Sequence, residues 1–286
     1  MSIDVLQNRI RKLKNPSMVA FVPDKNKIPP LYLEAEPNEA KAYFLYAKDI
    51  LTALKDMVAA VRFDFGTFSL LGADGLTVLA ELTAYSRQQG YYVVLDAPAV
   101  YSPKTAELSA DLLMNRWEFD GLLLNCYLGS DGIKPYVDAI KSNDKDLFLA
   151  LRTANKSAPE LQDLLTGTRL VYTAAADMAK RLGDDLVARC GYSRIAGVGP
   201  AVSADSLQLL RSKYPALFLL IDGFDYSGAN AKNCSMAFDR LGHGAVACAG
   251  ESITAAWQED AGDPIMLAVE AAERMRKNLT RYVGIL

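Results

Sequence analysis

The sequence predicts an α/β protein that folds as a single (β/α)8 TIM barrel with an extra N-terminal helix. Eight short apolar runs recur along the 286 residues, and segments with helical periodicity separate them. Each run is short enough to form a strand that helices cover on both faces, as a parallel sheet requires. Eight such β–α units in about 280 residues favour a closed barrel.

The elements are expected to alternate along the chain. Strands are predicted at residues 18–22, 57–62, 92–96, 121–125, 147–152, 194–198, 216–221 and 244–248. Helices are predicted at residues 39–56, 72–89, 106–117, 132–141, 171–188, 204–213, 231–241 and 264–282. A doubly wound sheet usually has a Gly-rich turn after its first strand, whereas Val22-Pro23-Asp24 follows here. The barrel is therefore the preferred fold.

Residues 1–16 contain the extra helix, which leads into the first strand. Ile3, Leu6, Ile10 and Leu13 recur at helical spacing. The segment lacks the continuous apolar region of a signal peptide. Since the chain shows no internal repeat, long linker or low-complexity tract, residues 1–286 are expected to form one domain.

Composition favours a cytoplasmic protein that binds neither nucleic acid nor a membrane. The net charge is −3 with mixed signs, so neither nucleic acid nor an anionic membrane is expected as a partner. Cys126, Cys190, Cys234 and Cys248 are far apart, which predicts free thiols rather than disulfides or a zinc site. The single histidine, His243, excludes a multi-histidine metal site within one chain and is expected to be an ordinary loop residue.

Four motifs carry the functional information. Residues 95–105 read Leu-Asp-Ala-Pro-Ala-Val-Tyr-Ser-Pro-Lys-Thr, and residues 125–132 read Asn-Cys-Tyr-Leu-Gly-Ser-Asp-Gly. Residues 160–163 read Glu-Leu-Gln-Asp, and residues 256–258 read Ala-Trp-Gln. With these motifs the chain resembles the orotidine 5'-phosphate decarboxylases over essentially its whole length, in particular their longer bacterial branch. The resemblance implies a TIM-barrel lyase of pyrimidine (UMP) biosynthesis that uses no cofactor.

The resemblance also implies that part of the catalytic array is replaced. The family's third strand ends in Asp-x-Lys-x-x-Asp, with a Thr four residues later. Asp96 and Thr105 match the first Asp and the Thr, whereas Pro98 stands at the Lys and Tyr101 at the second Asp. Arg62 matches an earlier Lys of the same array. Proline has no proton to donate and a tyrosine phenol is neutral near pH 7, so decarboxylation is expected to be lost.

Substrate-binding positions are implied in the same way. By resemblance, the residues retained for substrate are Asn125, Thr153, Asn155 and Thr105, together with Gly223 and Gly228 of the loop after the seventh strand. Val22 stands where the family has a ribose-binding Asp, and Ala154 where it has a Ser that reads the pyrimidine. Lys104 could act as a substitute acid, but a position in solvent is expected for it.

The phosphate contact is expected to be reversed in charge. Glu251 stands at the position of the family's phosphate-binding Arg, and Asp222 and Asp225 lie in the preceding loop. Each like-charge contact costs about 4 kcal/mol at ~4 Å and an effective dielectric constant of ~20. A 5'-phosphate is therefore not expected to bind. The three carboxylates could instead hold a divalent cation, although solvated loop carboxylates are expected and no metal site is assigned.

Three functions are compatible with these residues. The first, which we favour, is a regulatory or ligand-binding pseudoenzyme, because five contacts of one reaction have changed. It would bind either a small, non-phosphorylated, nucleoside-like molecule in the barrel mouth or another protein. The second is altered chemistry in the same barrel mouth, using Asp96, Tyr101, Arg62, Arg152 or the acidic cluster of Asp222, Asp225 and Glu251. The third is a genuine orotidine 5'-phosphate decarboxylase. The resemblance further implies a homodimer, with Tyr101 buried either in that interface or in its own emptied pocket.

Overall fold

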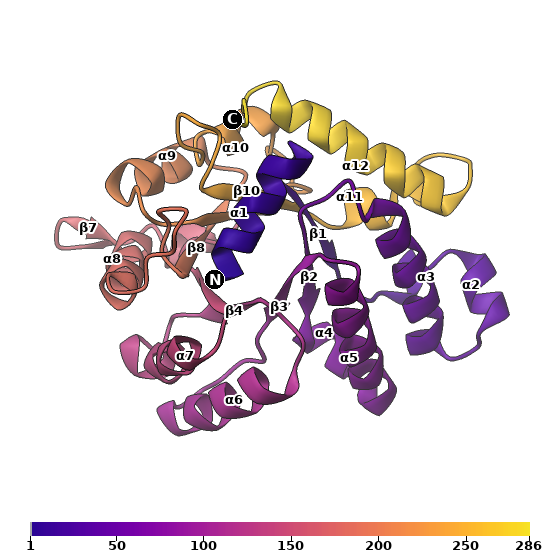
Figure 1. Ribbon diagram of the computed structural model, residues 1–286, viewed down its shortest axis with the longest axis horizontal. Coiled ribbons are helices and arrows are strands. Elements are labelled where there is room, and N and C mark those ends of the chain that lie inside the picture. The colour runs from indigo at the N-terminus through magenta and orange to yellow at the C-terminus, as the bar shows by residue number, and fades with distance from the viewer. Residues whose placement is uncertain (1) are drawn as a thin grey trace.

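The computed structural model, which describes residues 2–286, contains eight parallel strands that close into a barrel surrounded by helices (Figure 1). Around the barrel the strands follow the order β1-β10-β9-β8-β5-β4-β3-β2. Their bounds are β1 Ser17–Phe21, β2 Ala60–Asp64, β3 Tyr92–Asp96, β4 Gly121–Asn125, β5 Asp146–Ala150, β8 Ile195–Pro200, β9 Leu219–Asp222 and β10 Ala245–Ala249. The predicted fold is confirmed.

The helices cover the outside of the barrel (Figure 1). The main ones are α3 Glu39–Leu54, α5 Gly72–Gln88, α6 Pro103–Arg116, α7 Ser130–Ser142, α8 Val171–Gly183, α9 Ala204–Lys213 and α12 Pro264–Thr280. Apolar side chains of the strands point alternately to these helices and to the barrel interior. Phe63 of β2, for example, packs against Phe21 and Phe68 with ring centroids 5.3 and 6.1 Å apart.

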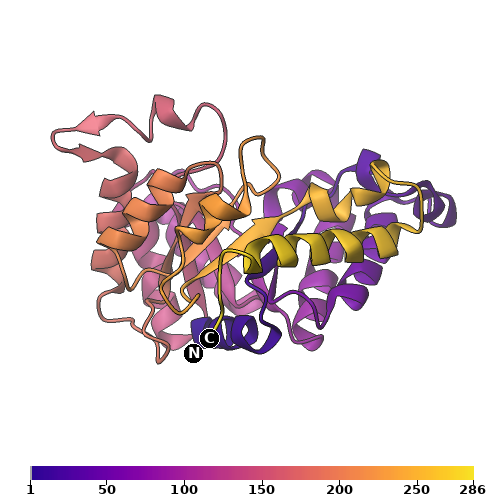
Figure 2. The same ribbon diagram turned by 90° about the horizontal axis from the view of Figure 1, so that it is seen from above.

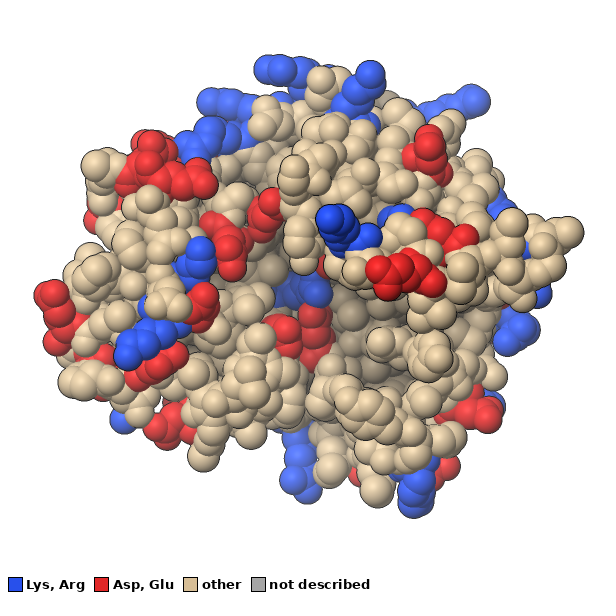
Figure 3. Space-filling view, turned by 180° about the vertical axis from the view of Figure 1, so that it is seen from behind, with Lys and Arg blue, Asp and Glu red and all other residues tan. Residues whose placement is uncertain are grey.

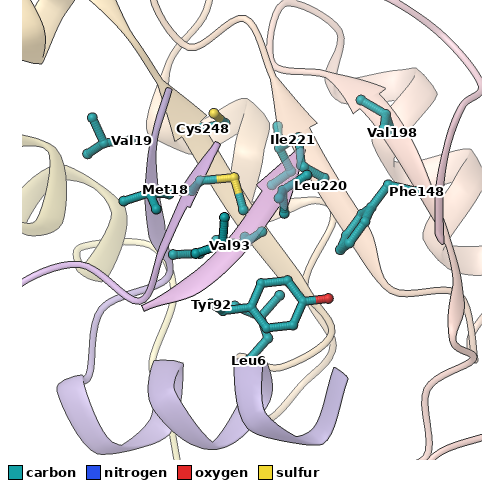
Figure 4. Close-up of a cluster of buried hydrophobic side chains, with 14 of the residues drawn as sticks. Leu6, Met18, Val19, Tyr92, Val93, Phe148, Val198, Leu220, Ile221 and Cys248 are labelled. Carbon is teal, nitrogen blue, oxygen red and sulfur yellow. The ribbon is translucent and has the colours of Figure 1, made fainter. Parts of the chain in front are cut away.

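The N-terminal helix α1 (Ser2–Leu13) closes the amino end of the barrel, as predicted. Ile3, Leu6 and Ile10 are fully buried, and Figure 4 shows Leu6 pointing from α1 toward Tyr92 of β3. The hydroxyl of Tyr92 donates a hydrogen bond of 2.8 Å to the buried carboxylate of Asp146. Both ends of the chain lie at this end of the molecule (Figure 2), so the opposite end of the barrel is free for a functional site.

Two predicted helices are too long. The helix expected over 231–241 is wrong beyond α10 (Ala231–Ser235), because the Asp239 carboxylate accepts hydrogen bonds from the backbone N–H groups of Leu241 and His243 and forms a turn instead. The helix expected over 171–188 ends at Gly183. There the chain packs so closely that a Cβ atom on Gly183 would lie 2.2 Å from the Ser193 hydroxyl oxygen.

Several short elements decorate the carboxyl end of the barrel and were not predicted. They are η1 Lys25–Lys27, α2 Pro30–Ala35, α4 Phe65–Leu70, η2 Ala158–Glu160, α11 Glu251–Thr254, η3 Ala256–Gln258 and a hairpin of β6 (Leu165–Thr166) and β7 (Arg169–Leu170). The hairpin projects from the body of the protein (Figures 1 and 2). Among the residues described, no helix is long and apolar enough to cross a membrane. The four cysteines are free, as predicted.

Candidate functional site

Arg62 lies at the centre of the carboxyl end of the barrel and binds two aspartates from other strands. Its Nε atom lies 2.8 Å from Asp96 Oδ1, and its Nη2 atom lies 2.6 Å from Asp96 Oδ2. Its Nη1 atom donates to Asp222 Oδ1 at 2.7 Å. The side chains of Arg62 and Asp96 are only 16% and 15% exposed. Strands β2, β3 and β9 are thus joined at their ends by one guanidinium group.

Burial and neighbouring charges shift the pKa values of this cluster in a consistent way. Burial lowers the pKa of Arg62, but the carboxylates of Asp96 and Asp222 outweigh it and hold that pKa well above its ordinary value. Burial raises the pKa of Asp96, and the carboxylates of Asp64 and Asp222 add to that rise, while Arg62 opposes it. One cation therefore serves more carboxylates than it can neutralise.

A cavity of about 450 Å³ opens above this cluster, and we call it the mouth cavity. Figure 3 shows basic and acidic side chains next to each other in the hollow at the centre of this face. The charged residues that line the cavity are two cations, Lys27 and Arg62, and five carboxylates, Asp64, Asp96, Asp222, Asp225 and Glu251. The cavity therefore has an excess of negative charge and favours neutral or cationic ligands over anions.

The loop after β9 supplies one of these carboxylates to the first turn of α11. Asp225 accepts a hydrogen bond of 2.6 Å from the backbone N–H of Gly250 and another from the hydroxyl of Ser252. The loop turns at Gly223, whose φ is +78°, and a Cβ atom there would lie 2.3 Å from the Cβ of Ala154. In TIM barrels, phosphate often binds between the loops after strands seven and eight and a short extra helix. In this protein the Asp225 carboxylate accepts hydrogen bonds from two donors of that region, the Gly250 N–H and the Ser252 hydroxyl.

Lys27 is a cavity residue that the sequence interpretation missed. Its Nζ atom lies 3.4 Å from Glu251 Oε2 and donates a hydrogen bond of 3.0 Å to Gln258 Oε1. These contacts tie η1, in the segment between β1 and α3, to the segment that follows β10. Lys27 sits in a loop that shows no strand or helix periodicity, so only the fold brings it next to Glu251.

Some residues that line the mouth cavity were predicted from the sequence as site residues, and others were not. Arg62, Asp96, Gly223 and Glu251, all predicted site residues, line the mouth cavity together with the substituted position Val22. Asp64 caps α4 by accepting from the backbone N–H of Gly66 at 2.7 Å. The residues that sequence reasoning did not single out for the site include Tyr226, Cys248 and Thr254.

The loop after β3 holds Tyr101 away from the cavity. Tyr101 is 85% exposed, so the prediction that it folds back into its own emptied pocket is wrong. The other predicted location, an interface between two copies, is compatible with this exposure. Thr105 lies in the first turn of α6, where its backbone N–H donates to the Ser102 side chain at 3.1 Å. Lys104 forms an exposed ion pair with Glu107.

The remaining predicted substrate residues lie outside the mouth cavity. Asn125 ends β4, and its Oδ1 atom accepts from the backbone N–H of Tyr127 at 2.9 Å. Thr153 is held by Gln162, whose Oε1 atom accepts from the Thr153 backbone N–H at 2.8 Å, and the Thr153 hydroxyl donates to Asn155 Oδ1 at 2.6 Å. Gly228, with a φ of +91°, lies in the loop after β9 without lining the cavity.

A metal site is not formed by the acidic loop residues. Within residues 2–286 no group of three or more His, Cys, Asp or Glu side chains is arranged to hold a metal ion. Asp222 binds Arg62, Asp225 binds the first turn of α11, and Glu251 pairs with Lys27. Each carboxylate considered for a cation is thus engaged by a donor of the protein itself.

Individual known proteins resemble the chain, although no protein-family model matches it. The orotidine 5'-phosphate decarboxylase of Clostridium acetobutylicum is 28% identical over 288 residues, which cover 98% of this chain and 100% of that protein. That of Clostridium novyi is 28% identical over 259 residues, with 90% of each chain covered. The structure of OMP decarboxylase from Leishmania donovani is similar with a TM-score of 0.74 at 21% identity, covering 97% of this chain and 98% of that one. The structural likeness supports the barrel fold.

Proposed function

We propose that this full-length homologue of the orotidine 5'-phosphate decarboxylases is a ligand-binding protein that does not decarboxylate orotidine monophosphate. Its ligand is a small, non-phosphorylated, nucleoside-like molecule held in the mouth cavity. The observation that carries the proposal is the charge of that cavity, where five carboxylates surround two cations and the one arginine is saturated by Asp96 and Asp222.

The proton transfer step is the first reason. A carbanion on a pyrimidine ring needs an acid that releases a proton near pH 7. Arg62 does not deprotonate in proteins, Pro98 carries no ionisable group, and the Lys27 ammonium is engaged by Glu251 and Gln258. Asp96 accepts hydrogen bonds from Arg62 through both oxygens, which orients it as a partner of the guanidinium rather than as an acid.

The phosphate is the second reason. A 5'-phosphate brings about two negative charges into a cavity that already holds an excess of carboxylates. The Gly250 N–H and the Ser252 hydroxyl, which lie where a phosphate of such a barrel is usually bound, are occupied by Asp225. A nucleoside avoids this repulsion and keeps the ring and the ribose as binding groups.

Genuine decarboxylation is the second candidate, and the similarity in sequence favours it. Two curated orotidine 5'-phosphate decarboxylases match at least nine-tenths of the chain at 28% identity. In that case Lys27 would be the proton donor, because it is the lysine that lines the mouth cavity among the residues described. Its ion pair with Glu251 would then have to open during the reaction.

A single assay separates the two candidates. Purified protein is mixed with orotidine monophosphate, and the ultraviolet absorbance of the substrate is followed. We expect no loss of absorbance above the uncatalysed rate, and calorimetry on the same preparation should show tighter binding of uridine than of uridine monophosphate. Turnover that scales with protein concentration and disappears in Lys27→Met would establish the decarboxylase instead.

A further inference from the structure

A second cavity, of about 600 Å³, opens at the carboxyl ends of β4 and β5, and we call it the side cavity. It shares no lining residue with the mouth cavity. Its walls come from the end of β4 and the loop that follows, the end of β5, the segment before β6, and α8. They are Asn125, Cys126, Tyr127, Gly129, Ala150, Leu151, Leu161, Gln162, Val171, Ala174, Ala175 and Met178. Its volume falls within the range of roughly 300–1,000 Å³ that small-molecule sites occupy.

One face of α8 makes the hollow. Val171, Ala174, Ala175 and Met178 are spaced by three, four and seven residues, so they lie on the same side of the helix. The two central residues are alanines, and their short side chains leave space between the helix and the ends of β4 and β5. Val171, Ala174 and Ala175 stay partly exposed, so the core of the protein does not fill this space.

The side cavity is uncharged, whereas the mouth cavity is lined by seven charged side chains. The Cys126 thiol donates to the carbonyl oxygen of Ala150 at 3.1 Å, and burial raises the pKa of that thiol to about 11, so it stays neutral and unreactive near pH 7. A charged ligand would lose its hydration here without gaining a partner of opposite charge.

Two amide side chains give the cavity its polar groups. Asn125 uses Oδ1 to accept from the Tyr127 backbone N–H, and its Nδ2 group donates to no other group of the described residues. Gln162 is fixed by Thr153 through both of its amide atoms. Asn125 is exposed and lines the cavity, so its Nδ2 group remains available to donate a hydrogen bond to a ligand. Tyr127 and Leu161, 79% and 46% exposed, lie at the entrance.

We propose that the side cavity is a second binding site, for an uncharged and mainly apolar small molecule with a carbonyl oxygen that accepts a hydrogen bond from Asn125. The site lies at the end of the barrel where functional sites of this fold occur, yet it is separate from the mouth cavity. It goes beyond the proposed function, because none of its lining residues lines the mouth cavity, and Asn125, which the resemblance assigned to substrate binding, lies here instead.

The probe for this site is 2-quinolone, a neutral bicyclic lactam, and its binding to the full chain is measured by calorimetry. We expect saturable binding, and at least tenfold weaker binding of quinoline-2-carboxylate because no cation lines the cavity. Asn125→Leu should weaken 2-quinolone binding by about two- to tenfold, the effect of one neutral hydrogen bond. The double variant Ala174→Leu/Ala175→Leu should abolish binding by filling the cavity.

Matched variants keep the test specific. Arg181→Leu places a leucine on the exposed side of the same helix and should leave binding unchanged. Thermal unfolding of each variant verifies that it is folded. If the double variant does not fold, Asn125→Leu, which only removes a surface amide, tests the site in its place. Absence of 2-quinolone binding at millimolar concentration, equal binding of the carboxylate, or unchanged binding in the filled variant would overturn the proposal. Light scattering that shows the filled variant dissociating a dimer would assign the cavity to a second copy and overturn it as well.

Discussion

The guanidinium group of Arg62 and the carboxylate of Asp96 form a two-point ion pair at the floor of the mouth cavity, with N–O distances of 2.8 and 2.6 Å. Asp222 completes the arrangement at 2.7 Å on the third nitrogen. A planar guanidinium matches two carboxylates in this way better than a lysine ammonium would. The cation that lies deepest in the cavity is thus committed to the protein rather than to a ligand.

Replacement of Arg62 should be strongly destabilising. In Arg62→Met the largely buried carboxylate of Asp96 loses its partner, and breaking such a pair typically costs about 3–5 kcal/mol. Urea unfolding measures the change, with the exposed pair Lys134–Asp138 as control, where Lys134→Met should cost less than about 1 kcal/mol. Equal losses of unfolding free energy in the two variants would show that the ion pairs of Arg62 do not stabilise the fold more than an exposed pair does.

The double variant Arg62→Met/Asp96→Leu separates the ion pair from simple packing. Removing both charges should recover most of the stability lost in Arg62→Met, because the largely buried Asp96 carboxylate is gone and the Asp222 carboxylate that loses Arg62 is 30% exposed to water. A double variant as unstable as the single one would mean that the loss comes from packing around Arg62.

Glu251 should control whether the mouth cavity accepts a phosphate. Glu251→Arg removes one negative charge, adds a positive one and leaves Lys27 free of its ion pair. Since Glu251 is 64% exposed, solvent screens the effect, and we expect about tenfold tighter binding of uridine monophosphate with little change for uridine. Glu259→Arg, an exposed change outside the cavity, is the control for net charge. Tight nucleotide binding by the unmodified chain would contradict this prediction.

The ion pair of Arg152 and Asp163 predicts a specific pH dependence of stability. The hydrogen bonds from Arg152, at 2.8 Å each, lower the pKa of Asp163 below its ordinary 3.8. A lowered carboxyl pKa adds stability that is fully present above pH 3.8 and is lost as the pH falls through the folded-state value. Asp163→Asn should therefore cost about 1–2 kcal/mol at both pH 7 and pH 5, but less at pH 3. Urea unfolding at the three pH values tests this, and a cost that does not change with pH would rule it out.

The barrel was predictable because its strands and helices differ in period. All eight strands were found with ends within three residues, since apolar runs such as 92–96 are buried on both faces and carry the signal themselves. The helix expected over 231–241 failed for a local reason. Asp239 offers the backbone an alternative set of hydrogen bonds, and apolar periodicity does not record that competition.

The site was only partly predictable. Arg62, Asp96, Gly223 and Glu251 could be placed in one cavity because the ends of parallel strands meet at one face of a barrel. Lys27 could not, since it lies in an irregular loop and reaches Glu251 only through the closure of the barrel between β1 and β10. The separate, uncharged side cavity could not be predicted either. It depends on the small side chains of α8, and the periodicity of apolar residues carries no information on side-chain volume.

The last prediction concerns association. Tyr101, Leu108 and Leu112 are 85%, 56% and 43% exposed in the loop after β3 and in α6, and apolar exposure of this kind is a feature of interfaces. We expect a homodimer that buries this segment, with Tyr101 near the mouth cavity of the other copy. Light scattering at micromolar concentration should report twice the mass of the chain.

Tyr101→Asp should shift the equilibrium toward the monomer, because a carboxylate in that interface would lose its hydration. Leu70→Asp, a change at another highly exposed apolar residue on a different element, is the control and should leave the mass unchanged. A monomer at micromolar concentration would leave Tyr101 in solvent and exclude a role for it in a second copy's site.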